Sequence, residues 1–303
     1  MRKVCKKKMF KNFCTDAFGL SGAGSEVSEL ALSFGFKSLD VDIVDFAAQV
    51  KAVGMTKARR FCDSAKLQFS TFRLPVDWHD DPEHLKNDLA ALPEYLEIAR
   101  ELGCTRALTG IEPAGDMRPF HENFEYHRRK LLELAAAVEP FGMSLGVEFQ
   151  AQASYKKDRA FQFIQSADQA LLLLKSVHAP NLGLVLDTWH WHLGGGTLDP
   201  IRSLDGEQIV AVYLSDCDEG VTAADAVETA RRLPGETGVI DCAAILTALA
   251  ELGYEGPLSP RPCRENLAGQ SRDKSVKAAS SALDECWKTA GLSSQGKPLA
   301  AAT

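Results

Sequence analysis

The chain has 303 residues, with 34 Lys and Arg against 41 Asp and Glu, and a formal net charge of −7. Hydrophobic residues make up 45% of the sequence and charged residues 25%, a balance that is typical of globular proteins and excludes wholesale disorder. The acidic balance argues against a broad nucleic-acid interface, and no apolar run approaches the roughly 20 residues that a membrane span requires.

We therefore expect neither a nucleic-acid partner nor a membrane association. The eight cysteines include no CxxC pair and no zinc-ligand spacing, so we interpret them as reduced thiols of a cytoplasmic protein. We expect a basic N-terminal tail over residues 1–9, one domain over 10–290 and a loose tail over 291–303. The sequence leaves the oligomeric state open.

Short apolar runs alternate with longer helical patterns along the chain. The runs predict eight strands, over residues 10–15, 37–42, 66–72, 105–110, 144–149, 182–187, 209–214 and 256–260. Stripes with helical spacing lie over residues 81–103, 124–138, 161–177 and 245–252. Asp81 is the expected N-cap of the first stripe, and Pro93 is expected to kink it.

Continuous apolar runs of this kind are typical of parallel strands that are buried on both faces. Eight strand–helix units in about 290 residues have the count and size of an α/β fold of the (β/α)8 TIM-barrel type. A doubly wound sheet would alternate in the same way, but no Gly-x-Gly-x-x-Gly follows any of these strands. We therefore predict the barrel.

Carboxylates end two of the most apolar strands. The active site of such a barrel lies at the C-terminal ends of its strands. Glu148 and Asp187 each close a buried run, and His190 follows three residues after Asp187. A buried carboxylate requires a cation, a metal ion or hydrogen bonds, so each acid is either a hydrogen-bonded structural residue or part of a site.

Four stretches carry a more specific resemblance. They are Leu-Gly-Val-Glu148-Phe, Leu-Val-Leu-Asp187-Thr-Trp-His190, Leu-Pro-Gly-Glu-Thr-Gly-Val-Ile-Asp241 and Gly-Tyr-Glu-Gly-Pro-Leu-Ser-Pro260. Together they resemble the sugar phosphate isomerase/epimerase family of xylose-isomerase-like TIM barrels, over about residues 10–290. The resemblance implies an isomerase, epimerase or dehydratase that acts on a small keto-sugar or polyol by proton transfer next to a carbonyl.

The resemblance also implies a divalent metal ion (Mn²⁺, Mg²⁺, Co²⁺ or Zn²⁺) held by four ligands at strand ends. Glu148 and Asp187 match the first two ligands, and His190 matches a histidine that contacts substrate. The chain departs at the other two positions, where Tyr213 replaces a histidine and Arg261 replaces a glutamate. Half of the implied ligand set is therefore missing, and the cofactor stays unknown, with metal binding expected to be weak or absent.

Two arrangements of these residues remain open. In the first, Arg261 places its guanidinium where the metal would lie, between Glu148 and Asp187, and Tyr213 donates a hydrogen bond to one carboxylate. In the second, Arg261 points to solvent and a metal binds weakly through Glu148, Asp187 and Asp216.

Further candidates each have a functional and a structural interpretation. Glu112 contacts substrate or acts as a base, or it forms a salt bridge in its loop. Trp78 and Trp189 stack on a sugar-sized ligand, or they pack the barrel mouth. Asp216 binds substrate or is a structural acid, and Arg231 binds an anionic substrate or is solvated.

Two functions follow from these residues. In the first, an enzyme with a degenerate metal site binds a carbohydrate-like ligand, with Glu148 as the base and His190 polarising a substrate oxygen. In the second, a metal-free and catalytically inactive protein of the same fold binds a sugar or a partner.

Overall fold

The computed structural model describes residues 9–20, 24–79, 82–293, 296 and 299. The predicted cap residue Asp81, the basic tail before Met9 and most of the C-terminal tail lie outside these residues. The main sheet contains β1 (Phe10–Phe13), β2 (Ser38–Leu39), β3 (Gln68–Phe69), β4 (Phe72–Arg73), β5 (Arg106–Ile111), β7 (Ser144–Phe149), β9 (Leu182–Asp187), β10 (Ile209–Leu214) and β13 (Pro257–Pro260).

These strands are parallel and close on themselves. Their order is β3-β2-β1-β13-β10-β9-β7-β5-β4. The strands at the two ends of this order, β3 and β4, are separated only by Ser70 and Thr71, so they are two halves of one bent strand. Its first half pairs with β2 and its second half with β5, which completes a barrel of eight strand segments among the described residues. The predicted α/β barrel is confirmed.

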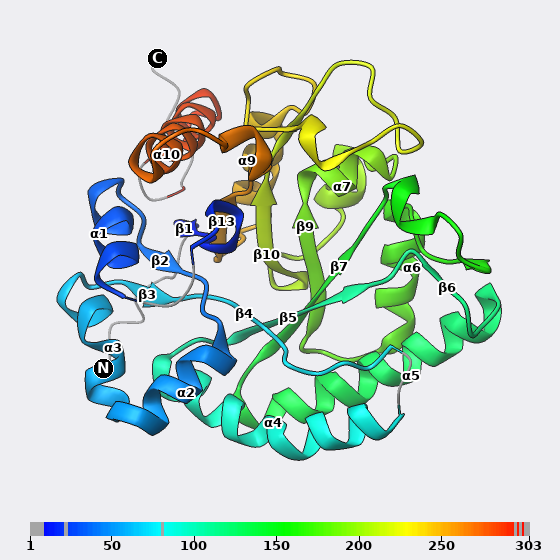
Figure 1. Cartoon of the computed structure of the whole chain (residues 1–303). Coiled ribbons are helices and arrows are strands. Elements are labelled where there is room, and N and C mark those ends of the chain that lie inside the picture. The colour runs from blue at the N-terminus through cyan, green and yellow to red at the C-terminus, as the bar shows by residue number, and fades with distance from the viewer. Residues whose placement is uncertain (1–8, 21–23, 80–81, 294–295, 297–298, 300–303) are drawn as a thin grey trace.

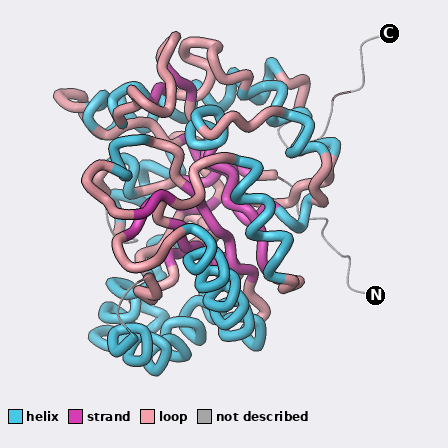
Figure 2. The backbone as a smooth tube through the Cα atoms, turned by 90° about the vertical axis from the view of Figure 1, so that its right-hand side faces the viewer, coloured by secondary structure: helices cyan, strands magenta, loops and turns pink. Residues whose placement is uncertain are grey.

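Helices surround the strands (Figure 1). They are α1 (Ser25–Ser33), α2 (Ile43–Val53), α3 (Met55–Ser64), α4 (Pro82–Leu102), α5 (Phe120–Val138), α6 (Ala167–Val177), α7 (Thr188–Leu193), α8 (Leu198–Arg202), α9 (Cys242–Glu251) and α10 (Arg272–Thr289). The side view in Figure 2 shows the strands enclosed by helices and loops. Among the described residues, no helix combines the length and the apolar character needed to cross a membrane.

Two details of the elements differ from the sequence prediction. The stripe over 161–177 is a helix only from Ala167, because the Ser166 side chain caps α6 by accepting the N–H of Gln169. Phe161–Gln162 instead forms β8, which pairs with β6 (Ala114–Gly115). In the first stripe, α4 runs on through Pro93 to Leu102.

A third difference concerns the second strand, predicted over 37–42. It ends at Leu39, so Asp40 is the residue at its C-terminal end. Asp42 caps α2 instead, where its side chain accepts the N–H groups of Val44 and Asp45. The carboxylate that this strand presents at the barrel mouth is therefore that of Asp40.

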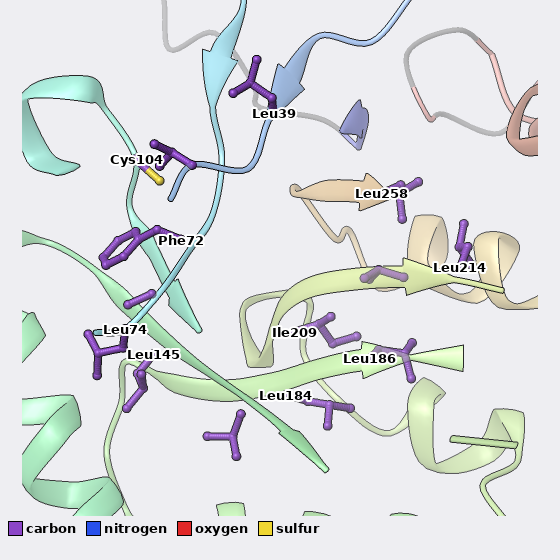
Figure 3. Packing of buried hydrophobic residues seen from close by; sticks show 14 of the residues in the cluster. Leu39, Phe72, Leu74, Cys104, Leu145, Leu184, Leu186, Ile209, Leu214 and Leu258 are labelled. Atoms are coloured by element: carbon purple, nitrogen blue, oxygen red, sulfur yellow. The ribbon is translucent and has the colours of Figure 1, made fainter. Parts of the chain in front are cut away.

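Alternation along the strands separates two layers of apolar side chains. The large layer lies between strands and helices, and Figure 3 shows part of it, including Leu145, Leu184 and Leu186. A small cluster inside the barrel contains Leu108, Val185, Val210 and Tyr213, with Cys14 and Ala211. Since side chains two residues apart share a face, Asp187 lies on the same interior side as Val185.

Glycine makes room inside the barrel. A Cβ atom built on Gly146 would lie 2.8 Å from Val185 Cγ2 and 2.9 Å from Leu108 Cδ2. Glu148 follows Gly146 by two residues on β7, so its side chain enters the same interior at the C-terminal end. The parallel strands thus bring Glu148 and Asp187 to one mouth of the barrel.

Candidate active site at the barrel mouth

Arg261 bridges the two strand-end carboxylates. It follows β13, and its Nη1 donates to Glu148 Oε1 and, at 3.1 Å, to Asp187 Oδ2. The Arg261 side chain is 23% exposed, whereas those of Glu148 and Asp187 are 8% and 1% exposed. The geometry is that of the first arrangement expected from the sequence, with a guanidinium between the two acids.

Tyr213 does not act as expected within this cluster. No hydrogen bond joins it to either carboxylate among the described residues, and its ring instead lies under Arg261, with Cζ 4.7 Å from the ring centroid. A cation over an aromatic face is held by the ring quadrupole. Tyr213 therefore supports the guanidinium rather than a carboxylate.

Asp187 has a second and closer cationic partner. Nη1 of Arg231 donates to Asp187 Oδ2 at 2.8 Å and to Oδ1 at 3.1 Å, and it also lies 3.1 Å from Ser215 Oγ. The Arg231 guanidinium lies over Trp189, with Cζ 4.5 Å from the ring centroid. Arg231 is buried, so it is neither a solvated residue nor directly available to a ligand.

Arg73 and His190 complete the cluster. Nη2 of Arg73, at the end of β4, lies 3.4 Å from Glu148 Oε2, and its side chain is largely exposed. His190 is buried on α7, which begins where the Asp187 side chain accepts the N–H groups of Trp189 and His190. Ala151 N lies 3.4 Å from Nδ1 of His190, and Arg231 Nη2 lies 3.4 Å from Nε2.

The arginines fix the protonation states of this cluster. Burial raises the pKa of Glu148, but Arg261 and Arg73 more than reverse that and hold it below its usual range. Burial also raises the pKa of Asp187, but the charges of Arg231, His190 and Arg261 outweigh burial and hold the pKa well below its usual range. Burial and Arg231 lower the pKa of His190, so its imidazole is neutral at pH 7.

A cavity of about 390 Å³ opens beside this cluster. Its walls include Arg73, Arg261 and Tyr213, together with Cys14 and Asp40 from the ends of β1 and β2. Glu148, Asp187 and His190 do not line it. A ligand in the cavity would therefore meet the guanidinium groups of Arg73 and Arg261 and the carboxylate of Asp40, whereas Glu148 and Asp187 lie behind the arginines.

Two of the predicted acids lie apart from the Glu148–Asp187 cluster or serve the fold. Glu112 is half-exposed, and its Oε2 lies 3.6 Å from Arg159 Nη2. Asp216 is fully buried, and its carboxylate accepts the backbone N–H groups of Cys217, Thr237, Gly238 and Ile240, at 2.7–2.9 Å. The Asp216 carboxylate thus fastens the loop before α9 to the end of β10.

The two predicted stacking residues are inaccessible in this arrangement. Trp78 and Trp189 each have 0% exposed surface. Trp78 donates its indole N–H to Thr109 Oγ1 at 2.8 Å and stacks on His79, and Trp189 is covered by Arg231. The structure places neither ring on the wall of the cavity.

A family model described as "Xylose isomerase-like TIM barrel" matches residues 28–286. The chain belongs to this family. Inosose isomerase of Bacillus subtilis is 26% identical over 149 residues, which are 49% of this chain and 50% of that protein. 3-Dehydroshikimate dehydratase of Pseudomonas aeruginosa is 28% identical over 79% of this chain and 36% of that protein. The chain thus spans half or less of the length of these two relatives.

Solved structures share the fold. A xylose isomerase domain protein from Alicyclobacillus acidocaldarius has a TM-score of 0.83 at 22% identity, covering 93% of this chain and 99% of that one. The IOLI protein, whose structure holds a zinc atom, has a TM-score of 0.75 at 19% identity, covering 94% and 98%. The two relatives are thus named as an isomerase and a dehydratase, and one of the two solved structures holds a zinc atom.

Glu148, Asp187 and His190 offer ligand atoms that lie within 4.8 Å of one another, as a metal site would require. The surrounding charges do not fit such an ion, because Arg261 Nη1 contacts both carboxylates and Arg231 contacts Asp187 and faces His190. A divalent ion at this place would have to displace Arg261 Nη1 from both carboxylates, and Arg231 would repel it. As arranged, these residues hold guanidinium groups, not a divalent metal.

Proposed function

We propose that this chain is a metal-independent enzyme that moves a proton next to a carbonyl in a small, hydroxylated and negatively charged substrate. The net reaction is an isomerisation, an epimerisation or a dehydration. The observation that carries the proposal is the contact of Arg261 Nη1 with both Glu148 and Asp187. A fixed cation thereby stands where the resemblance implies a metal ion.

The charges of the cluster favour an anion. Arg73, Arg231 and Arg261 are positive, Glu148 and Asp187 are negative and His190 is neutral, so this cluster alone carries one positive charge, while Asp16, Asp40 and Asp42 add carboxylates to the wall of the cavity. Arg73 and Arg261 both line the cavity. Guanidinium N–H groups bind carboxylate or phosphate oxygens in pairs, and they stabilise the negative oxygen that forms when a proton leaves the carbon next to a carbonyl.

Glu148 and Asp187 have a supporting role in this proposal. A carboxylate whose pKa is held below its usual range is a poor proton acceptor, so we assign to Glu148 the positioning of Arg261 rather than the role of base expected from the sequence. Asp187 holds both Arg261 and Arg231. His190, neutral and buried, stands behind Arg231 and lies out of contact with the cavity.

The names of the relatives supply candidate substrates. 3-Dehydroshikimate carries a carboxylate in addition to a ring carbonyl and hydroxyls, whereas an inosose is an uncharged cyclic polyol ketone. The guanidinium groups of Arg73 and Arg261 on the cavity wall can bind such a carboxylate through paired N–H groups. We expect the chain to turn over 3-dehydroshikimate or a similar keto-acid in preference to an inosose or to D-psicose, whose 3-epimerase shares the fold with a TM-score of 0.69 at 14% identity.

The test is an activity assay on 3-dehydroshikimate, inosose and D-psicose, before and after treatment with EDTA, with the metal content measured in parallel. We expect turnover that chelation does not reduce. One tightly bound Mn²⁺ or Zn²⁺ per chain, with activity lost on its removal, would contradict the proposal and favour the metal-dependent isomerase.

The cavity also favours a second candidate, a binding protein that has lost turnover, because none of Glu148, Asp187 and His190 reaches the ligand space. In that case calorimetry would show saturable binding of 3-dehydroshikimate, while proton NMR would show neither product nor exchange of its C–H protons with solvent.

A further inference from the structure

The carboxylate of Asp40 lies on the wall of the cavity. Asp40 ends β2, is partly exposed and lines the cavity together with Arg73, Arg261 and Tyr213. Two other acids also line it, Asp16 and Asp42. Asp16 is exposed and Asp42 is held as the cap of α2, so Asp40 is the acid that is both recessed and open to the ligand space.

A buried polar network holds this carboxylate in one position. The Nδ2 atom of Asn12 donates to Asp40 Oδ1 at 2.6 Å, and Thr71 Oγ1 donates to the same oxygen at 2.5 Å. Ser38 and Ser70 both donate to Asn12 Oδ1, which fixes the orientation of the amide and directs its N–H toward Asp40. Both of these donors use Oδ1, which leaves Oδ2 toward the ligand, and the Cys14 thiol also hydrogen-bonds this carboxyl group.

The electrostatics of Asp40 are opposite to those of Glu148 and Asp187. Burial raises the pKa of Asp40 above its usual range, and the hydrogen bonds from Thr71, Asn12 and Cys14, with the charge of Arg261, only partly offset this. A carboxyl group with a raised pKa accepts and returns a proton more readily near neutral pH than one held low by arginines.

We propose that Asp40 is the residue that takes up and returns the proton in the reaction proposed above, on which this inference rests. The C–H bond next to the carbonyl breaks, its proton passes to Asp40 Oδ2, and its electron pair forms an enolate. Arg261 and Arg73 donate to the enolate oxygen. In an isomerisation, the proton of the neighbouring hydroxyl passes to the enolate oxygen, and Asp40 returns its proton to the former carbonyl carbon, so that the carbonyl re-forms at the neighbouring carbon. In a dehydration, the enolate re-forms the carbonyl as the β-hydroxyl leaves with the proton of Asp40, as water.

The experiment compares Asp40→Asn with Asp42→Asn, which removes one carboxylate from the same cavity and keeps an N-capping side chain. The probe is 3-dehydroshikimate in D2O, followed by proton NMR for both product and exchange of its C–H protons. We expect Asp40→Asn to slow turnover and exchange at least 100-fold, the lower bound for general acid–base catalysis. Binding of the probe, measured by calorimetry, should change less than threefold. Asp42→Asn, which changes the charge of the cavity by the same amount, should slow turnover and exchange at least tenfold less than Asp40→Asn does.

The pH profile adds a second readout. The groups around Asp40 are Cys14, Cys104, Tyr213 and Arg261. Burial raises the pKa of both thiols and of the phenol, and that of Cys104 to about 12, while Arg261 stays charged. None of them titrates between pH 4 and 9, so an ascending limb of kcat/KM above the ordinary aspartate pKa of about 4 belongs to Asp40.

Thr71→Val tests the assignment should Asp40→Asn fail to fold. It removes a hydrogen bond that lowers the pKa of Asp40, so the ascending limb should move to higher pH, and an unmoved limb would overturn the inference. A folded Asp40→Asn variant with wild-type turnover would overturn it too, while leaving the proposed function intact. A wild-type chain that neither converts nor exchanges any of the three probes would overturn both.

Discussion

Replacing Arg261 by methionine tests whether its guanidinium stabilises the barrel mouth. The variant keeps an unbranched apolar chain similar to the aliphatic part of arginine and removes the charge. Glu148 would be left with Arg73 alone, at 3.4 Å and largely in solvent, while Asp187 would keep Arg231. Removing one partner of a buried ion pair destabilises a protein by about 3–5 kcal/mol, and we expect the lower end of this range because both acids retain a cation.

A loss of about 3 kcal/mol corresponds to a fall in Tm of about 5 °C for a chain of this length, at an unfolding entropy of about 2 cal/mol/K per residue. Calorimetric melts at pH 7 measure it. Arg73→Met is the matched control: the Arg73 side chain is 62% exposed, and exposed pairs contribute about 1 kcal/mol or less.

The loss of stability in Arg261→Met should depend on pH, because Glu148 must be charged to form its ion pair with Arg261. The folded-state pKa of Glu148 lies below its unfolded value, so its ion pairs stabilise the fold above the unfolded pKa of about 4.3 and lose this contribution as the pH falls through the folded pKa. The gap between wild type and Arg261→Met should therefore be full above about pH 6 and shrink below pH 4. Equal melts for Arg261→Met and Arg73→Met at pH 7 would refute the reasoning.

Three further predictions concern the mouth and the interior of the barrel. Tyr213→His combined with Arg261→Glu should restore a complete ligand set and bind one Mn²⁺ in a calorimetric titration, with Arg261→Glu alone binding less tightly; a wild type that binds just as tightly would contradict this. Asp216→Ala should destabilise the fold by about 4 kcal/mol in urea titrations and expose residues 237–240 to protease, because backbone N–H groups lose their acceptor. Gly146→Ala should cost about 1–3 kcal/mol by overpacking, whereas Gly115→Ala, whose added Cβ meets nothing within 4 Å, should melt like wild type.

The sequence was sufficient to predict the barrel and three members of its mouth. Continuous apolar strands ending in Glu148 and Asp187 placed those acids, and the departure at Arg261 placed the cation between them. These predictions held because strand ends in a parallel barrel converge whatever the loops do.

Arg231 and Asp40 could not be placed in the same way. Arg231 reaches Asp187 across 44 residues, from the short strand β12 (Arg231–Arg232) in an irregular segment, and nothing in the spacing indicates that contact. Asp40 was missed because the pattern over 37–42 predicted one strand, whereas the structure has a two-residue strand there followed by the N-cap of the next helix. The helical periodicity that begins at Ile43 is a signal that Asp42 belongs to the helix, which would have left Asp40 as the strand end.

Arg261 makes the counter-ion of the mouth a part of the polypeptide. An ion taken from the medium has to be acquired after folding, competes with other ions and can be stripped by a chelator. A guanidinium on the segment after β13 arrives with the backbone, in a ratio of one per chain, at the moment when that strand joins β10 and β1. The pairing of β13 in the barrel thus also brings the positive charge of Arg261 to Glu148 and Asp187.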